Sequence, residues 1–281
     1  MKEIKRYLDT RQGTYSFYFE DLNSGYTYGL DENVLMASAS CIKVPIAIAL
    51  FREVENNKID LNLKIMINKE DMVDGSGIIY EFDEREYSVK ELLIAMLIQS
   101  DNTATNKLID LIGIERINEL IKEMGLINTS LNRKIRDVIS REKGIQNSSS
   151  SFDLSACLKM LYNKTYLNEK NSNLLLRILC RQQIRNKIPF YIPKKEWSNI
   201  ANKSGSLPGV ENDSALFMIS KGNFVFTVMS KNLPNNVYGL VTISKVSKMM
   251  WDIVDKEMGQ MKFFSRAENE LQLLLGNHPL T

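Results

Sequence analysis

Ser40 and Lys43 have residue types and a spacing that suit covalent chemistry. A nearly continuous apolar run, residues 44–51, follows them and predicts a helix that is buried on all sides. Side chains three residues apart share a helix face, so the Lys43 amine is expected to reach the Ser40 hydroxyl. A lysine at the mouth of a buried helix is costly unless it is partnered or partly neutral. That cost is the first indication that the pair does chemistry.

Ser100, Asp101 and Asn102 form a second polar cluster, between two apolar segments with helical spacing. All three residue types are preferred at helix N-termini, so the cluster predicts a helix cap. A cap needs only one of the three side chains. The cluster could also present a hydroxyl and an amide to a cleft, and both interpretations stay open at this point.

Lys203, Ser204, Gly205 and Ser206 lie at the end of a predicted strand. One interpretation is simply a strand end followed by a turn. In the other, the strand edge holds an acyl substrate with its backbone N–H groups and hydroxyls, and the glycine permits close approach. Lys203 would then add a fixed positive charge facing the two earlier serines.

The rest of the composition argues against several other mechanisms. The one histidine, His278, lies close to the C-terminus, which is a poor place for a packed Ser-His-Asp or Cys-His site. Three cysteines at scattered positions, Cys41, Cys157 and Cys180, predict neither a disulfide framework nor a metal site. We therefore expect a base other than histidine, no metal and no cofactor. The net charge of +2 gives no reason to expect a nucleic-acid or membrane partner.

The predicted elements change character twice along the chain. Alternating and aromatic segments predict strands near both ends, and helical spacing dominates from about residue 60 to about residue 190. The simplest fold is one sheet completed by both ends of the chain, with an inserted all-α domain. We expect a sheet domain of residues 1–55 and 195–281, an inserted domain of residues 56–194, and an active site between them.

The three clusters occur in the order Ser-x-x-Lys, Ser-Asp-Asn and Lys-Ser-Gly. In this order, and on these elements, they resemble the motifs of class A β-lactamases and penicillin-binding serine hydrolases, with serine for threonine in the third motif. The resemblance covers roughly residues 14–256. It implies an α/β (α+β) fold of the β-lactamase/transpeptidase type, in which helices flank an antiparallel sheet.

The resemblance also implies a role for each motif residue. Ser40 resembles the nucleophile that is acylated, and Lys43 resembles its base or proton relay. Ser100 resembles the proton shuttle to the leaving nitrogen. Asn102 resembles the amide that binds the acyl side chain, and Lys203 the cation that supports Ser100 and attracts a substrate carboxylate.

The third motif is implied to hold the substrate. The backbone N–H groups of Ser40 and Ser206 would form an oxyanion hole, in which each donor contributes on the order of 3 kcal/mol. Ser204 and Gly205 would complete the substrate-binding edge.

The chain departs from the class A pattern in the loop that should carry the deacylating base. Class A enzymes have a glutamate two residues beyond a structural arginine and an asparagine four residues later. Matching that arginine to Arg133 places Ile135 and Ile139 at these positions, and neither can act as a base. Other registers offer Asp137 or Glu142, whose alternative role is to pair with arginines on a solvated loop.

These observations predict a serine hydrolase that is acylated on Ser40 by a β-lactam or a related amide or ester and deacylates slowly. The alternative is a penicillin-binding-type sensor, or a D-alanyl-D-alanine peptidase or esterase relative, that is acylated without efficient turnover. We expect a monomer with a small-molecule substrate.

The N-terminal segment has charges but no apolar core or cleavage site of a signal peptide. No apolar run reaches the ~18 residues that span a bilayer. As written, the sequence predicts a cytoplasmic protein, or an extracellular or cell-surface one if a leader precedes it.

Overall fold

The computed structural model describes the backbone of residues 1–275 and the side chains of residues 1–140 and 142–256. His278 lies outside the described residues. The central feature is a five-stranded sheet in the order β2-β1-β9-β8-β7, in which every neighbouring pair is antiparallel. Its strands are β1 (Thr14–Asp21), β2 (Thr27–Leu30), β7 (Ile200–Leu207), β8 (Val210–Ile219) and β9 (Gly222–Lys231). Both ends of the sequence therefore supply strands to one sheet, as expected.

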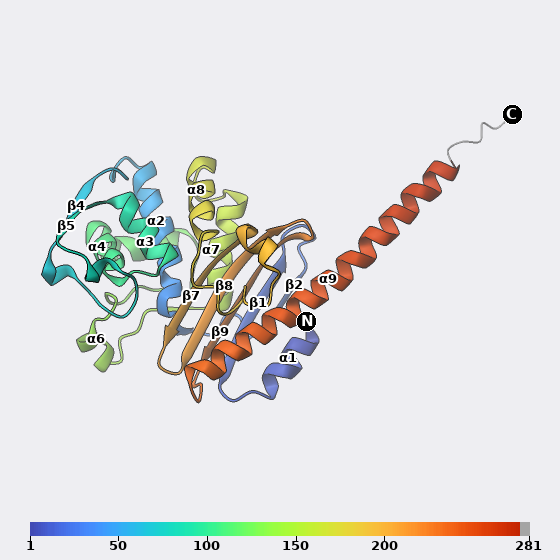
Figure 1. Cartoon of the computed structure of the whole chain (residues 1–281), viewed down its shortest axis with the longest axis horizontal. Coiled ribbons are helices and arrows are strands. Elements are labelled where there is room, and N and C mark those ends of the chain that lie inside the picture. Colours follow the sequence, from blue (N-terminus) through green and yellow to red (C-terminus); the bar gives the residue numbers. More distant parts are fainter. Residues whose placement is uncertain (276–281) are drawn as a thin grey trace.

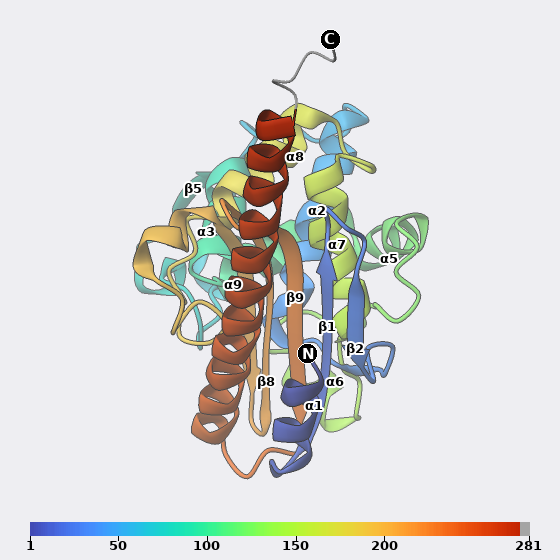
Figure 2. The same ribbon diagram turned by 90° about the vertical axis from the view of Figure 1, so that its right-hand side faces the viewer.

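One face of the sheet is covered by the two terminal helices, α1 (Lys2–Asp9) and α9 (Asn236–Leu275). Figure 2 shows both helices on the same side of the strands. Alternate strand residues such as Phe17 and Phe226 pack there with Ile4 and Trp251, because side chains on a strand point to opposite faces in turn. The helix α9 runs to residue 275 and projects beyond the sheet (Figure 1).

The helices of the middle of the chain lie on the other face (Figure 1). They are α2 (Lys43–Glu55), α3 (Val89–Ile98), α4 (Asn102–Ile112), α5 (Ile114–Glu123), α6 (Val138–Glu142), α7 (Ser151–Asn163) and α8 (Glu169–Leu179). Of these, α7 is hydrogen-bonded to the sheet itself, through Ser155 to Thr227 and Ser151 to Ser16.

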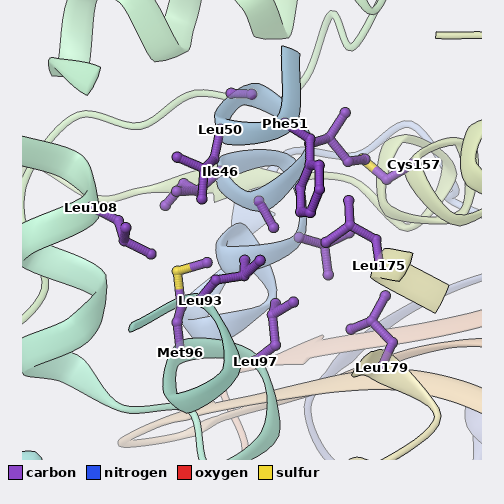
Figure 3. Close-up of a cluster of buried hydrophobic side chains, with 14 of the residues drawn as sticks. Ile46, Leu50, Phe51, Leu93, Met96, Leu97, Leu108, Cys157, Leu175 and Leu179 are labelled. Carbon is purple, nitrogen blue, oxygen red and sulfur yellow. The ribbon is translucent and has the colours of Figure 1, made fainter. Parts of the chain in front are cut away.

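The helix α2 is the centre of this helical layer. Its residues 44–51 are all buried, as the apolar run predicts. Figure 3 shows Ile46, Leu50 and Phe51 surrounded by side chains from the neighbouring helices. Those side chains include Leu93, Met96, Leu97, Leu108, Cys157, Leu175 and Leu179. A helix packed on every side is held rigidly. This packing also fixes the position of the residues at its N-terminus.

Two short pairs of strands lie outside the main sheet. β3 (Met36–Ala37) pairs with β6 (Ser148–Ser149), and β4 (Lys64–Ile67) pairs with β5 (Arg85–Ser88). The chain also forms four short 3₁₀ turns within the described residues: η1 (Ala39–Ile42), η2 (Lys69–Asp71), η3 (Ile79–Glu81) and η4 (Lys194–Asn199). The α+β class and the antiparallel sheet flanked by helices are thus confirmed, whereas the domain boundaries stay a prediction. Within residues 1–275, no helix combines the length and apolarity needed to cross a bilayer.

Candidate active site

Ser40 stands on the short turn η1, directly before α2. The predicted helix therefore begins later than expected, with Lys43 as the first residue of α2. The residue before Ser40, Ala39, has φ of 48°, a left-handed conformation that non-glycine residues rarely adopt. Backbone strain of this kind concentrates at functional sites, where the surrounding packing holds it in place.

The strand β7 runs directly against this turn because residue 205 is a glycine. A Cβ on Gly205 would lie 2.7 Å from the Ser40 backbone nitrogen and 2.9 Å from Ala39 Cβ. Such contacts leave no room for any side chain. The close approach places the end of β7, with Ser206, beside the backbone N–H of Ser40.

Lys43 is completely buried, and its Nζ lies among three hydrogen-bonding oxygens. Nζ donates to Ser100 O at 2.6 Å, to Ser100 Oγ at 3.1 Å and to Asn102 Oδ1 at 3.0 Å. Burial, reinforced by repulsion from Lys203, lowers the pKa of Lys43 well below its usual value. The expected hydrogen bond to the Ser40 hydroxyl is not made within the described residues; Nζ lies within hydrogen-bond distance of these three oxygens instead.

Lys203 reaches the same hydroxyl from the opposite side. Its Nζ donates to Ser100 Oγ at 3.0 Å and to Ser204 O at 2.8 Å, and the side chain is fully buried. Burial lowers the pKa of Lys203 to about 8, assisted by the positive charge of Lys187. Two lysines thus fill the lone pairs of the Ser100 oxygen, which leaves its O–H free to donate elsewhere.

Both interpretations of the Ser-Asp-Asn cluster hold, for different residues. Asp101 is the cap: its Oδ1 accepts from the Ala104 N–H at 2.8 Å at the start of α4. Its Oδ2 accepts from the N–H groups of Ile78 and Ile79 at 2.7 and 2.9 Å. This buried carboxylate therefore ties the loop before η3 to the helix that follows the cluster.

Asn102 faces the cleft rather than capping the helix. Its Nδ2 donates to Asp74 O at 2.7 Å, while its Oδ1 accepts from Lys43. Ser100 has φ of 57°, a second strained residue, which turns its carbonyl and hydroxyl toward the two lysines.

A buried ion pair that no sequence pattern predicts lies beneath the end of β7. Lys187 and Glu211 are 2.5 Å apart and almost completely buried. Lys187 Nζ also donates to Gly205 O at 2.8 Å and to Ser206 Oγ at 3.1 Å. Ser206 in turn donates to Glu211 Oε2 at 2.8 Å. Neither Lys187 nor Glu211 belongs to a motif, and no local pattern in the sequence indicates them.

A pocket of ≈ 230 Å³ opens in front of Ser40. Ser40, Asn102 and Ser206 line it, whereas Lys43 and Lys203 are buried behind its wall. The facing wall comes from the loop after α5, through Arg133, Ile135, Arg136, Asp137, Val138, Gln146 and Asn147. The predicted site residues are thus close together: some line the pocket, and the others are buried directly behind them.

The loop is held by polar contacts from both sides. Arg133 is buried and donates from Nε to Ile145 O at 2.9 Å, and from Nη2 to Gln146 Oε1 at 3.0 Å. The Asn106 side chain accepts from the Ile135 N–H at 2.8 Å and donates to the Ile135 carbonyl at 3.0 Å. These bonds fix the backbone of Ile135, whose side chain is part of the pocket wall.

The two alternative carboxylates are poor candidates for a base. Asp137 lines the pocket, but it accepts from the Ser140 N–H at 3.0 Å and Oγ at 2.5 Å, which hold its pKa below the ordinary value. It therefore serves α6 as a cap, a structural role with a different partner from the expected arginines. Glu142 is exposed and lies outside the pocket lining, as does Ile139.

Comparisons with known proteins identify the family to which this chain belongs. The model of the β-lactamase enzyme family matches residues 1–254. The β-lactamase BRO-1 of Moraxella catarrhalis is 29% identical over 188 residues, which cover 66% of this chain and 59% of that protein. The chain thus spans about three fifths of the length of this curated relative.

Two solved structures have the same fold at a TM-score of 0.83. A β-lactamase from Sphaerobacter thermophilus DSM 20745 is 26% identical, with coverage of 90% of this chain and 96% of that one. A leucine-to-glutamate mutant of PBP-A, described as an acyl-enzyme complex with penicillin G, is 27% identical, with coverage of 91% and 96%. The chain belongs to the β-lactamase enzyme family.

Proposed function

We propose that the protein is a serine hydrolase that forms an acyl-enzyme on Ser40 with a β-lactam, or a related amide or ester, and releases the acyl group slowly. The observation that carries this proposal is a pocket lined by Ser40 and Ile135, with Lys43, Ser100 and Lys203 hydrogen-bonded to one another in the buried layer beside it. The PBP-A mutant described as an acyl-enzyme with penicillin G supports the choice of a β-lactam as the probe.

Acylation begins with the transfer of the Ser40 proton to Lys43. Burial and the charge of Lys203 favour the neutral amine, which has a lone pair to accept that proton. The Ser40 oxygen then attacks the carbonyl carbon of the substrate. The backbone N–H groups of Ser40 and Ser206 are the donors for the resulting oxyanion, since Gly205 brings β7 against η1.

Collapse of this intermediate needs a proton on the leaving nitrogen. Ser100 is suited to donate it, because its oxygen accepts from Lys43 and Lys203 while its O–H remains free. The proton taken by Lys43 replaces the one lost by Ser100, over the 3.1 Å contact between them. The C–N bond breaks, the acyl group stays on Ser40, and both lysines return to their starting states.

Deacylation needs a base that activates water near the ester, and the pocket wall offers none of suitable strength. Ile135 is aliphatic, and Asp137 is the single carboxylate among the residues that line the described pocket. A carboxylate of lowered pKa, already bonded to Ser140, is a weak base. The same observation favours the second candidate, a penicillin-binding-type sensor, or a D-alanyl-D-alanine peptidase or esterase relative.

Intact mass spectrometry during reaction with a chromogenic cephalosporin tests the proposal. We expect one adduct per chain, mapped to Ser40 by peptide digestion, with slow release of free protein. Ser40→Ala should form no adduct, and an adduct that persists on this variant would overturn the assignment of the nucleophile. Rapid steady turnover would contradict slow deacylation. Turnover of an acyl-D-alanyl-D-alanine peptide or a thioester, but not of the cephalosporin, would favour the second candidate.

A further inference from the structure

A second hollow, larger than the pocket at Ser40, lies between α3, α8 and the C-terminal end of β8. This groove has a volume of ≈ 880 Å³ and shares no lining residue with the active-site pocket. It is lined by Lys90, Ile94, Asn173, Leu174, Leu176, Arg177, Cys180, Arg181, Ser198 and Met218. We propose that this groove binds an amphipathic monocarboxylate with a medium-length alkyl chain.

The floor of the groove is apolar. Ile94 of α3, Leu174 of α8 and Met218 of β8 are each only partly buried, so these side chains leave apolar surface open to the groove. Burying such surface against an alkyl chain is favourable because it removes apolar area from water.

The rim of the groove carries three basic side chains, Lys90, Arg177 and Arg181, and the lining contains no acidic residue. All three are exposed, and none makes a hydrogen bond or an ion pair with another described residue. Elsewhere on the described surface many lysines and arginines have carboxylate partners, such as Lys107 with Asp71. The groove therefore combines an apolar floor with cations that are available to a ligand.

The spacing along the two helices explains why floor and rim face the same hollow. Leu174, Arg177 and Arg181 recur at i, i+3 and i+7, which places them along one face of α8 and its C-terminal end. Lys90 and Ile94 recur at i and i+4 on α3, and α3 packs against α8. An alkyl chain on the floor would leave its carboxylate beside Arg177 and Arg181, where a guanidinium can bind it with two parallel hydrogen bonds. A cationic or neutral amphiphile lacks that second interaction.

Calorimetric titration of the full chain with dodecanoate, below the concentration at which it forms micelles, tests the site. We expect saturable binding of one molecule, with affinity reduced at least tenfold in the double variant Arg177→Gln/Arg181→Gln. Lys122→Gln, which removes an exposed cation from α5, is the matched control and should bind as the wild type does. Ser40→Ala should also bind unchanged, since the groove lies apart from the pocket. Binding lost in that variant would place the ligand in the active site and overturn the proposal.

Cys180 provides an independent readout from inside the groove. It is partly accessible, whereas Cys41 and Cys157 are buried. Alkylation at pH 9, followed by peptide mapping, should be slowed several-fold at Cys180 by dodecanoate and little affected by dodecyltrimethylammonium. Equal protection by the two amphiphiles, or no protection by dodecanoate, would overturn the proposal. Neither result depends on acylation of Ser40. The groove proposal and the proposed function can therefore be refuted independently of each other.

Discussion

Lys43 and Lys203 donate to the same oxygen, Ser100 Oγ, at 3.1 and 3.0 Å. Lys43 lies on α2 and Lys203 on β7, so the two side chains reach this oxygen from different elements. Two buried cations that share one hydroxyl repel each other, and this repulsion adds to burial in lowering the pKa of Lys43. In the proposed mechanism, this arrangement supplies a neutral amine as the base for Ser40.

Lys203→Gln should shift the pH dependence of acylation upward. Without the neighbouring charge, the pKa of Lys43 rises, so a smaller fraction of the amine is neutral at pH 7. The acylation rate should fall at least about tenfold at pH 7 and recover in part at higher pH, since one pKa unit changes the neutral fraction about tenfold. Rapid-mixing measurements of adduct formation from pH 6 to pH 10 would record this.

Lys203→Arg is the matched control, because it keeps the positive charge. Its rate profile should have its midpoint near that of the wild type, even if the rate itself is lower. A midpoint that is the same in Lys203→Gln and the wild type would show that Lys203 does not set the pKa of Lys43.

Ile135→Glu should accelerate deacylation. The new carboxylate would replace an aliphatic side chain in the pocket wall, on a backbone already fixed by Asn106. A positioned general base contributes about 10²- to 10⁴-fold, so release of the adduct at least tenfold faster is expected. The decay of the Ser40 adduct by mass spectrometry is the measurement. Ile139→Glu, at an exposed residue outside the pocket, should leave that decay unchanged. Equal decay rates in the two variants would mean that the loop is matched wrongly.

Gly205→Ala should suppress acylation by forcing β7 away from η1. The added methyl would lie 2.7 Å from the Ser40 nitrogen, so the oxyanion donors of Ser40 and Ser206 would separate. Loss of one such donor costs about 10²- to 10³-fold in rate. The acylation rate constant should fall by about that factor, while circular dichroism remains that of the wild type. Ser206→Ala keeps the backbone N–H and should lose much less. Equal losses in the two variants would argue against the oxyanion hole.

The stability of the protein should rise with pH between about 8 and 10.5 through Lys203. Its pKa in the folded protein is about 8, below the unfolded value of 10.5, so the unfolded chain binds more protons in this interval. The unfavourable contribution of the buried charge is complete below pH 8 and is relieved as pH rises, by on the order of 3 kcal/mol. Urea unfolding at several pH values should show this slope, reduced in Lys203→Met. Identical slopes would contradict the lowered pKa.

The sequence by itself determined the elements of the site and the family. The apolar run at 44–51 specifies a buried helix because no face of it is polar, and the structure confirms that burial. The order of strand-rich and helix-rich segments predicts the sheet built from both ends, and the three motifs indicate the family, which the family match confirms. The roles of Ser40, Lys43, Ser100 and Lys203 stay predictions.

Only the tertiary structure decided which groups meet. Helical spacing predicts that Lys43 contacts Ser40, but its hydrogen bonds go to Ser100 and Asn102, 57 and 59 residues away in the chain. The Lys187–Glu211 pair beneath Ser206 has no local signature, because it forms only where the segment between α8 and η4 packs against β7 and β8. Periodicity reports which face of an element is buried, whereas hydrogen-bond partners between distant elements depend on how the whole core packs.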